Sequence, residues 1–283
     1  MNFKRSIGSG ETTKNHSWHH RKSAGIGAIL TALALTGCTL FMRNTPTPIP
    51  TQMAQVSATR SSTSLVVFLP GRGGSMTDFE RNGFLATLKE AGVNADTVTV
   101  DAHLGYYIKR TIIERLWADV LQPARQQGYH RIVLVGVSLG GVGALFCERE
   151  HPGAADALVL LGPYLGDDVR LFDRIATAGG PAAWATGRDL YAGGVEEQLW
   201  TFLGTRLASL PPTWLLYGQG DSLSAGHRLL AGLLPKTRVA TIAGAHDWPT
   251  WKALWRDVCF NSELFLAEKT ALTPDVAGTA SHR

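Results

Sequence analysis

The sequence predicts an α/β fold: a doubly wound, mostly parallel sheet of about six strands, with a small helical cap excursion. Six short apolar runs have the composition of buried strands, and segments with helical spacing of apolar residues separate most of them. This alternation is typical of parallel sheets that carry helices on both faces. The chain of 283 residues, 45% hydrophobic and 18% charged, is long enough for one such domain with a substantial core.

Four elements are expected before the middle of the chain. Each strand is a short apolar or β-branched run, and each helix has apolar residues on one face and stops at a glycine. In order, they are a strand at 65–69, a helix at 79–91, a strand at 97–100 and a helix at 112–127. The loop at 70–75, PGRGGS, is too rich in glycine to be explained by packing.

The central stretch, 131–145, reads RIVLVGVSLGGVGAL. An apolar run suited to a buried parallel strand meets Ser138 inside Gly136-Val137-Ser138-Leu139-Gly140, and small residues suited to a closely packed helix follow. Glycines on both sides of the serine allow a sharp turn that lifts the hydroxyl above the sheet edge, which is the pattern of a nucleophile elbow. An ordinary glycine–serine turn in a βα unit is the alternative.

The alternation continues to the end of the domain, with one interruption. Residues 167–210 contain glycine pairs and helical pieces in place of a strand, and we expect a cap there. The other elements are strands at 157–161, 213–217 and 238–242, a helix containing Leu229, Leu230 and Leu233, and a final helix at about 249–266.

Two residues that suit a serine nucleophile follow predicted strands. Asp221 comes after the strand at 213–217, and His246 comes after the strand at 238–242. Because the carboxyl ends of parallel strands meet at one edge, we expect both side chains near Ser138. Histidine can take the serine proton near neutral pH, and a carboxylate fixes its tautomer. These three residues form a candidate catalytic triad that requires no cofactor.

Each triad assignment has an alternative. The acid is Asp167 or Asp168 if it follows the strand at 157–161. In that case Asp221 is a turn residue, favoured by its glycine neighbour. A histidine at the position of His246 also suits the cap of the last helix, and Asp247 beside it either points away or caps that helix.

Acyl transfer also needs N–H donors for the developing oxyanion. We expect one from Leu139, at the start of the helix after the elbow, and one from Arg72, with Gly73 as second choice. The Arg72 side chain either binds a substrate anion or stays solvated.

Aromatic residues after two predicted strands are candidates for the substrate pocket. His103 and Tyr106 follow the strand at 97–100, and Tyr164 follows the strand at 157–161; packing is the alternative role for each. Cys147 and Cys259 are expected to be buried thiols on opposite faces of the sheet. Nothing has metal-ligand spacing, so no metal site is predicted.

The chain resembles the α/β-hydrolase superfamily from about Leu65 to Leu266, with the nucleophile, acid and base in that family's order. The segment 244–251, GAHDWPTW, is similar to the histidine segment of esterase D-like esterases, although Ala245 replaces a usual glycine. Where many relatives have His-Gly-X, this chain has Pro70-Gly71-Arg72. The resemblance implies acyl-ester chemistry and leaves the substrate open.

The N-terminal residues have the pattern of a targeting signal. A basic region is followed by an apolar stretch, 24–35, that is too short to span a bilayer comfortably. It ends in Leu35-Thr36-Gly37-Cys38, which resembles a lipobox and implies a signal peptide at 1–37 with lipid on Cys38. A secretory signal or an uncleaved anchor is the alternative. We expect a disordered tether at 38–64 and a disordered tail at 273–283.

This targeting reading sets the expected location and partners. The lipid would anchor the protein to a membrane of the cell envelope, with the residue after Cys38 favouring the outer membrane. Residues 1–37 account for the whole formal charge of +4, so the remainder is neutral and no nucleic-acid partner is expected. The expected partner is a small-molecule or lipid ester.

The expected activity is therefore hydrolysis of a carboxylic ester or related acyl bond through an acyl-serine intermediate. The same site also suits an acyltransferase, a thioesterase or an amidase. A binding lipoprotein without catalysis is the alternative from another class, because a fold does not determine a function.

Overall fold

The computed structural model describes residues 43–55 and 62–270, and within them it contains a seven-stranded sheet. The strand order is β1-β3-β2-β4-β5-β6-β7, and all neighbouring pairs are parallel except β1 with β3. The strands are β1 (Thr51–Gln55), β2 (Ser64–Leu69), β3 (Asp96–Val100), β4 (Arg131–Val137), β5 (Ala157–Leu161), β6 (Thr213–Gly218) and β7 (Val239–Ile242). The predicted mostly parallel α/β sheet is confirmed.

The strand β1 corrects the predicted tether. Residues 44–55 belong to the folded unit, in which Thr51–Gln55 pairs antiparallel with β3 and Ile49 is buried. The sequence argument missed this strand because TQMAQ has no apolar run: β1 lies at an edge, and four of its five residues are exposed. The predicted signal peptide, Cys38 and the tail at 273–283 lie outside the described residues.

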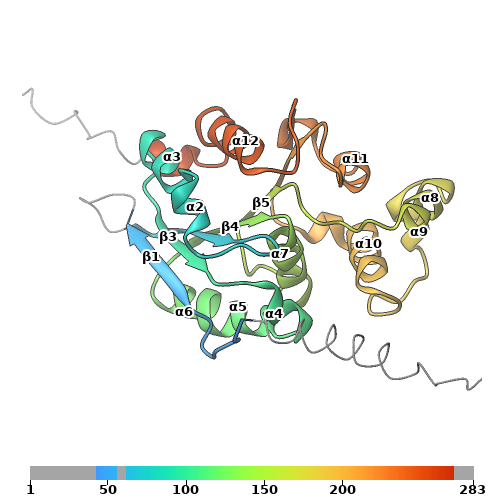
Figure 1. Ribbon diagram of the computed structural model, residues 1–283, viewed down its shortest axis with the longest axis horizontal. Coiled ribbons are helices and arrows are strands. Elements are labelled where there is room, and N and C mark those ends of the chain that lie inside the picture. Colours follow the sequence, from blue (N-terminus) through green and yellow to red (C-terminus); the bar gives the residue numbers. More distant parts are fainter. Residues whose placement is uncertain (1–42, 56–61, 271–283) are drawn as a thin grey trace, which may run out of the picture. The chain divides into compact units, whose positions relative to one another are not determined.

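Helices cover both faces of the sheet, as Figure 1 shows. Side chains alternate along β2, so Leu65, Val67 and Leu69 join one core cluster while Val66 and Phe68 join the other. The helices of the first half are α2 (Asp78–Arg81), α3 (Phe84–Glu90), α4 (Leu104–Ile108), α5 (Ile112–Leu116), the π-helical turn Trp117–Leu121, α6 (Gln122–Gln126) and α7 (Leu139–Glu150). Those of the second half are α8 (Val169–Thr177), α9 (Pro181–Ala185), α10 (Val195–Arg206), α11 (Ser224–Ala231), α12 (Trp248–Asn261) and α13 (Leu266–Thr270), with 3₁₀ turns at Leu207–Ser209 and Lys236–Arg238.

The two core clusters use different helices. Residues of α5, α6, α7 and α10 belong to one, and residues of α2, α3 and α12 belong to the other. Cys147 on α7 and Cys259 on α12 are therefore buried in opposite layers as free thiols, as predicted, and burial raises the pKa of each.

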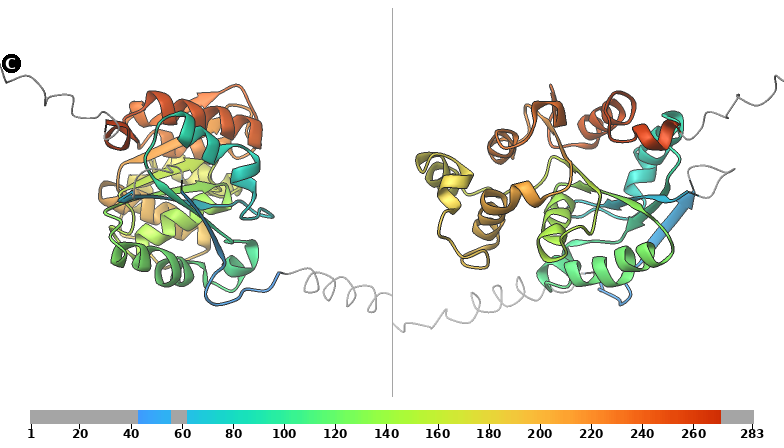
Figure 2. Two further views of the ribbon diagram at one scale, coloured as in Figure 1. Left: turned by 90° about the vertical axis from the view of Figure 1, so that its left-hand side faces the viewer. Right: turned by 180° about the vertical axis from the view of Figure 1, so that it is seen from behind.

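The cap prediction is also confirmed. Helices α8, α9 and α10 lie between β5 and β6 in the chain and stand to one side of the sheet in Figures 1 and 2. The indole N–H of Trp200 on α10 donates to the carbonyl of Leu165, which ties the cap to the loop after β5. No helix among residues 43–55 and 62–270 has the length and apolar content needed to cross a bilayer.

Candidate active site

Ser138 occupies the turn between β4 and α7 in a strained backbone conformation, with φ 51° and ψ −112°. The flanking glycines are required by close backbone contacts. A Cβ on Gly136 would lie 2.4 Å from the carbonyl oxygen of Gly140, and a Cβ on Gly140 would lie 2.1 Å from that of Leu69. The turn is therefore the strand–turn–helix expected of a nucleophile elbow.

The elbow is held from the neighbouring strand. The N–H of Ser138 donates to the carbonyl of Leu161 over 2.9 Å, and the N–H of Tyr164 donates to the carbonyl of Ser138 over 3.0 Å. Both partners belong to β5 or the loop that follows it. This loop fixes the backbone on both sides of the serine side chain.

The structure brings the three predicted triad residues together. Nε2 of His246 lies 3.0 Å from Oγ of Ser138, and Nδ1 of His246 lies 2.8 Å from Oδ2 of Asp221. Asp221 is 3% exposed, and its other oxygen accepts the N–H of Leu223 over 2.8 Å. Residues distant in the sequence thus form one hydrogen-bonded chain from hydroxyl to carboxylate.

Opposing influences act on the Asp221 carboxyl. Burial is the largest and would raise its pKa, but hydrogen bonds from His246 and the Leu223 N–H, together with the charge of His246, act in the other direction. The net pKa lies below the ordinary value, so the group is a carboxylate at neutral pH. An ionised Asp221 accepts a hydrogen bond from Nδ1–H of His246, which leaves Nε2 free to accept a hydrogen bond from the hydroxyl of Ser138.

The alternative acids serve elsewhere. Asp168 caps α8 by accepting the N–H of Arg170 over 3.0 Å, and Asp167 is exposed. Asp247 caps α12 by accepting the N–H of Thr250 over 3.0 Å.

The glycine-rich loop after β2 lies beside the serine. A Cβ on Gly71 would be 3.2 Å from the Cβ of Ser138. Arg72 and Ser138 line the same pocket of about 490 Å³, and Leu139 is the first residue of α7. The predicted oxyanion donors therefore come from the two segments that flank the nucleophile.

Two predicted pocket residues have a different role. His103 is buried, with Nε2 2.9 Å from the carbonyl oxygen of Asn44, and the buried Tyr106 donates its hydroxyl to the carbonyl of Pro46 over 2.8 Å. Neither is among the residues that line the pocket at Ser138. The prediction of a pocket role was wrong because the segment before β1, expected to be a tether, packs against them.

Tyr164 is placed between the site and the cap. Its N–H contacts Ser138, while its hydroxyl donates to Glu196 of α10 over 2.5 Å. Burial, followed by this hydrogen bond to a carboxylate, raises the pKa of the Tyr164 phenol. Its side chain is therefore tied to the cap, and it is not among the lining residues of the pocket.

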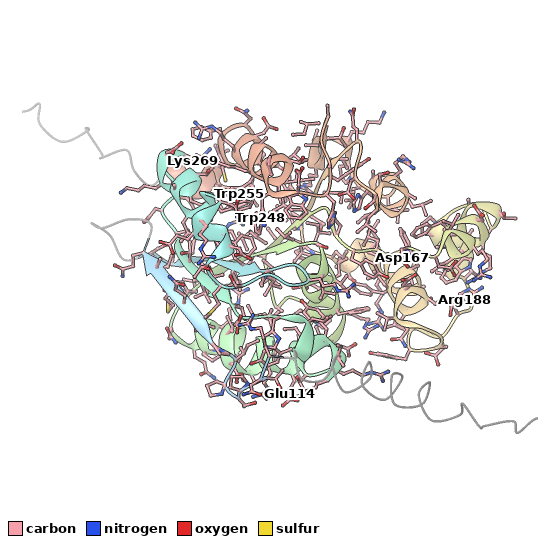
Figure 3. All side chains as sticks on the ribbon, in the orientation of Figure 1. Glu114, Asp167, Arg188, Trp248, Trp255 and Lys269 are labelled. Carbon is pink, nitrogen blue, oxygen red and sulfur yellow. The ribbon has the colours of Figure 1, made fainter. Side chains whose placement is uncertain are left out.

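Two tryptophans were not predicted as site residues. Trp248 and Trp251 line the pocket beside His246, and Trp248 packs edge-on against Phe79 and Phe84 of the second core cluster. Figure 3 shows Trp248 and Trp255 on α12, on the side of α2 and α3. The available signal was the motif 244–251, which contains both pocket tryptophans next to the histidine.

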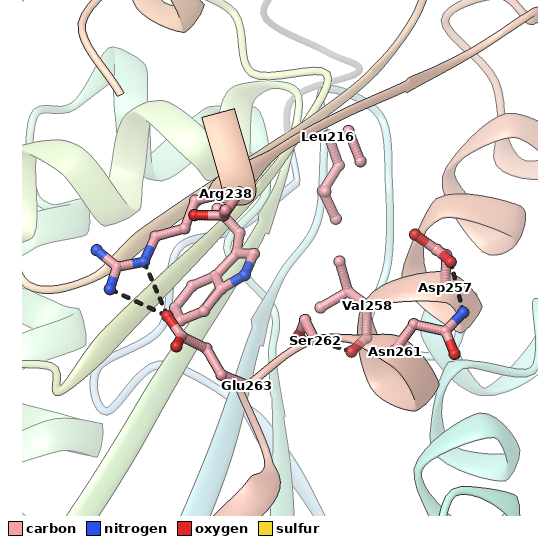
Figure 4. A pocket seen from close by; sticks show the side chains of 10 residues that line it. Leu216, Arg238, Asp257, Val258, Asn261, Ser262 and Glu263 are labelled. Carbon is pink, nitrogen blue, oxygen red and sulfur yellow. Dashed lines mark hydrogen bonds and ion pairs between the residues drawn. The ribbon is translucent and has the colours of Figure 1, made fainter. Parts of the chain in front are cut away.

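A second pocket, of about 250 Å³, lies between β6, β7 and α12 (Figure 4). Arg238 pairs with Glu263 at its rim, and Asn261 donates to Asp257, so these polar groups satisfy each other. The pocket contains no nucleophile–base pair. The pocket at Ser138 is therefore the candidate active site.

No protein-family model matches the chain, and no curated protein matches it. Among solved structures, the chain is similar to Est1E from Butyrivibrio proteoclasticus, with a TM-score of 0.51 and 15% identity over 78% of this chain and 94% of that one. The structure of Est1E with ferulic acid bound has a TM-score of 0.51 and 14% identity, over 79% of this chain and 96% of that one. A hydrolase from Pseudomonas aeruginosa PA01 is 17% identical over 74% and 92%, with a TM-score of 0.48.

The sheet, the elbow after β4 and the chain order of serine, aspartate and histidine agree with the similarity to Est1E. The chain has the α/β-hydrolase fold. In this fold, the cap lies between β5 and β6, and the candidate base follows β7. Because the identity is low, the similarity concerns the fold alone.

Proposed function

We propose that this protein is a serine hydrolase that cleaves a carboxylic ester or a related acyl bond. The observation that supports the proposal is the hydrogen-bonded chain from Ser138 through His246 to Asp221. A non-catalytic binding protein has no need for a strained serine aligned with an imidazole and a buried carboxylate.

In the proposed mechanism, Oγ of Ser138 attacks the acyl carbon while Nε2 of His246 takes the hydroxyl proton. Asp221 stabilises the imidazolium, and the N–H groups of Leu139 and Arg72 donate to the oxyanion. The tetrahedral intermediate collapses as His246 gives its proton to the leaving oxygen. Water then attacks the acyl-serine with His246 again as base, which releases the acid and restores the serine.

Hydrolysis is favoured over transfer to another alcohol by the walls of the pocket. Its described lining residues belong to the loop after β2, the first residue of α2, the elbow and the segment 246–251, and none belongs to α8, α9 or α10. A site that the cap does not line gives water access to the acyl-enzyme.

Fluorophosphonate labelling of the purified protein beside Ser138→Ala tests the nucleophile. We expect labelling of the parent only, because the probe reacts with an activated serine. Labelling of both proteins, or of neither, contradicts the proposal. A series of p-nitrophenyl esters of increasing acyl length then measures the preferred acyl chain.

We also propose that the protein is a lipoprotein of the cell envelope, anchored through Cys38. The support is the basic region, the short apolar stretch and the lipobox-like Leu35-Thr36-Gly37-Cys38. Metabolic palmitate labelling is expected in the parent and lost in Cys38→Ser. Persistent labelling of the variant contradicts the anchor.

A further inference from the structure

The indole N–H of Trp251 is a buried donor without an acceptor among residues 43–55 and 62–270. The side chain is 6% exposed and projects from the first turn of α12. Burying an N–H without a partner costs free energy, so a group left in this state next to reacting side chains calls for an explanation.

The donor lies at the junction of Asp221 and His246. A Cβ placed on Gly162 would be 2.8 Å from Nε1 of Trp251, 3.0 Å from Oδ2 of Asp221 and 3.3 Å from Nδ1 of His246. The three atoms therefore surround a single point on the side of the Asp221–His246 hydrogen bond that the loop after β5 covers. Gly162 has a φ of 49° and leaves that point empty.

The indole also fixes the plane of the imidazole. The rings of Trp251 and His246 are 4.9 Å apart and nearly perpendicular, at 88°. An edge-to-face contact of this kind restricts rotation of the smaller ring about its side-chain bonds. His246 needs such a restraint because its side chain is 25% exposed, whereas that of Asp221 is fully covered.

The acceptor capacity of Asp221 is not exhausted. Oδ1 accepts the N–H of Leu223, and Oδ2 accepts Nδ1–H of His246. Each carboxylate oxygen can accept two hydrogen bonds, so Oδ2 has one position left. The other charged or titratable groups around the pair are Asp247 at the start of α12 and His227 on α11.

We infer that Trp251 is a positioning residue, which packs against the imidazole of His246 and donates its indole N–H to Oδ2 of Asp221 when His246 is protonated. This role rests on the proposed function, and it adds a fourth side chain to Ser138, His246 and Asp221. Because this hydrogen bond forms only in the protonated state of the pair, it stabilises the imidazolium that His246 becomes when it takes the serine proton.

The test compares two substitutions that remove the N–H with a matched control. Trp251→Phe keeps an aromatic ring, and 3-benzothienylalanine at position 251 keeps the bicyclic shape. Trp214→Phe is the control, because Trp214 is also buried in the second core cluster and lines the other pocket. Its indole N–H likewise has no acceptor within the described part of the chain. The benzothienyl protein decides the result if Trp251→Phe does not fold.

Two measurements are made on the full chain. NMR of the Cε1–H of His246, without substrate, gives the titration midpoint of the imidazole. The pH dependence of kcat/KM for p-nitrophenyl acetate hydrolysis gives the corresponding midpoint for activity. We expect both midpoints to move downward by about 0.5–1 pH unit in the Trp251 variants and to stay at the parent value in Trp214→Phe.

The two readouts separate this inference from the proposed function. A shifted NMR midpoint in a protein without esterase activity supports the role of Trp251 and contradicts the proposed function. Hydrolysis by the parent, with unshifted midpoints in both Trp251 variants, overturns the role of Trp251 and leaves the proposed function in place. An equal shift in Trp214→Phe also overturns it, because the effect then reflects general loss of packing.

Discussion

The imidazole of His227 donates a hydrogen bond from Nε2 to the carbonyl oxygen of Pro163 over 2.8 Å, although 64 residues separate them. Pro163 lies in the loop after β5, which hydrogen-bonds the backbone of Ser138. His227 is on α11, the helix that follows Asp221 in the chain. The fully buried His227 therefore joins the segment that carries the acid to the loop that holds the nucleophile.

His227 should make stability depend on pH. Burial is the main cause that lowers its pKa below 6.5, and the neutral ring is favoured in the folded state. Since the unfolded chain binds the proton at higher pH, the stabilisation is full above pH 6.5 and declines as pH falls below it. Urea unfolding between pH 5 and 8 should show this decline in the parent, and His227→Gln should reduce it. An unchanged slope in the variant would show that other groups titrate.

Asp221→Asn should lower kcat by about 10³- to 10⁴-fold, because an amide presents the wrong tautomer partner to His246. The matched control is Asp168→Asn, since Asp168 follows the other strand from which an acid was expected and caps α8. We expect the control to keep kcat within about twofold and to lose at most ~1 kcal/mol of stability. Steady-state kinetics on a p-nitrophenyl ester measure kcat of both variants. A larger loss of kcat in Asp168→Asn would identify Asp168 as the catalytic acid in place of Asp221.

Gly162→Ala should lower activity far more than Gly153→Ala. Both glycines have positive φ, so each alanine costs about 1–2 kcal/mol of stability. A Cβ on Gly153 meets open space, whereas one on Gly162 meets the Trp251, Asp221 and His246 side chains. We expect a loss of about 10²-fold in kcat for Gly162→Ala, from displacement of the base. Equal activity of the two folded variants would mean that the triad tolerates displacement.

Tyr106→Phe and Tyr107→Phe should affect stability differently. Tyr106 loses the hydrogen bond to Pro46, which destabilises the fold by about 1 kcal/mol. The Tyr107 hydroxyl is buried without a partner among the described residues, so its removal should be neutral or stabilising. Thermal unfolding measures both. Unchanged kcat and KM in Tyr106→Phe would agree with the position of Tyr106 outside the pocket. A tenfold rise in KM would instead show that Tyr106 contributes to substrate binding.

The central strands could be predicted because a strand that is buried on both faces has apolar residues at nearly every position, as β4 and β5 do. Ser138, Asp221 and His246 could be predicted because parallel strands bring their carboxyl ends together, and the roles required three specific side-chain types. In these cases one local pattern and one rule of sheet geometry were sufficient.

The rest depended on contacts between distant segments. Thr51–Gln55 becomes a strand only because β3 offers a free edge, which no local pattern records. His103 and Tyr106 were placed at the correct edge of the sheet, but the segment that covers them decided their role. The final helix was expected to continue to about 266. It ends at Asn261, where the Ser262 hydroxyl bonds the carbonyl of Val258.

The edge strand β1 also has a consequence for self-association. Without it, the five buried residues of β3, Asp96–Val100, would present unpaired N–H and carbonyl groups from a β-branched segment, which is a template for intermolecular pairing. Backbone pairing with β1 satisfies these groups, and the Thr51, Gln52 and Gln55 side chains of β1 are exposed. A truncated chain beginning at Ser64, where the apolar pattern starts, would keep the triad and still be prone to aggregate.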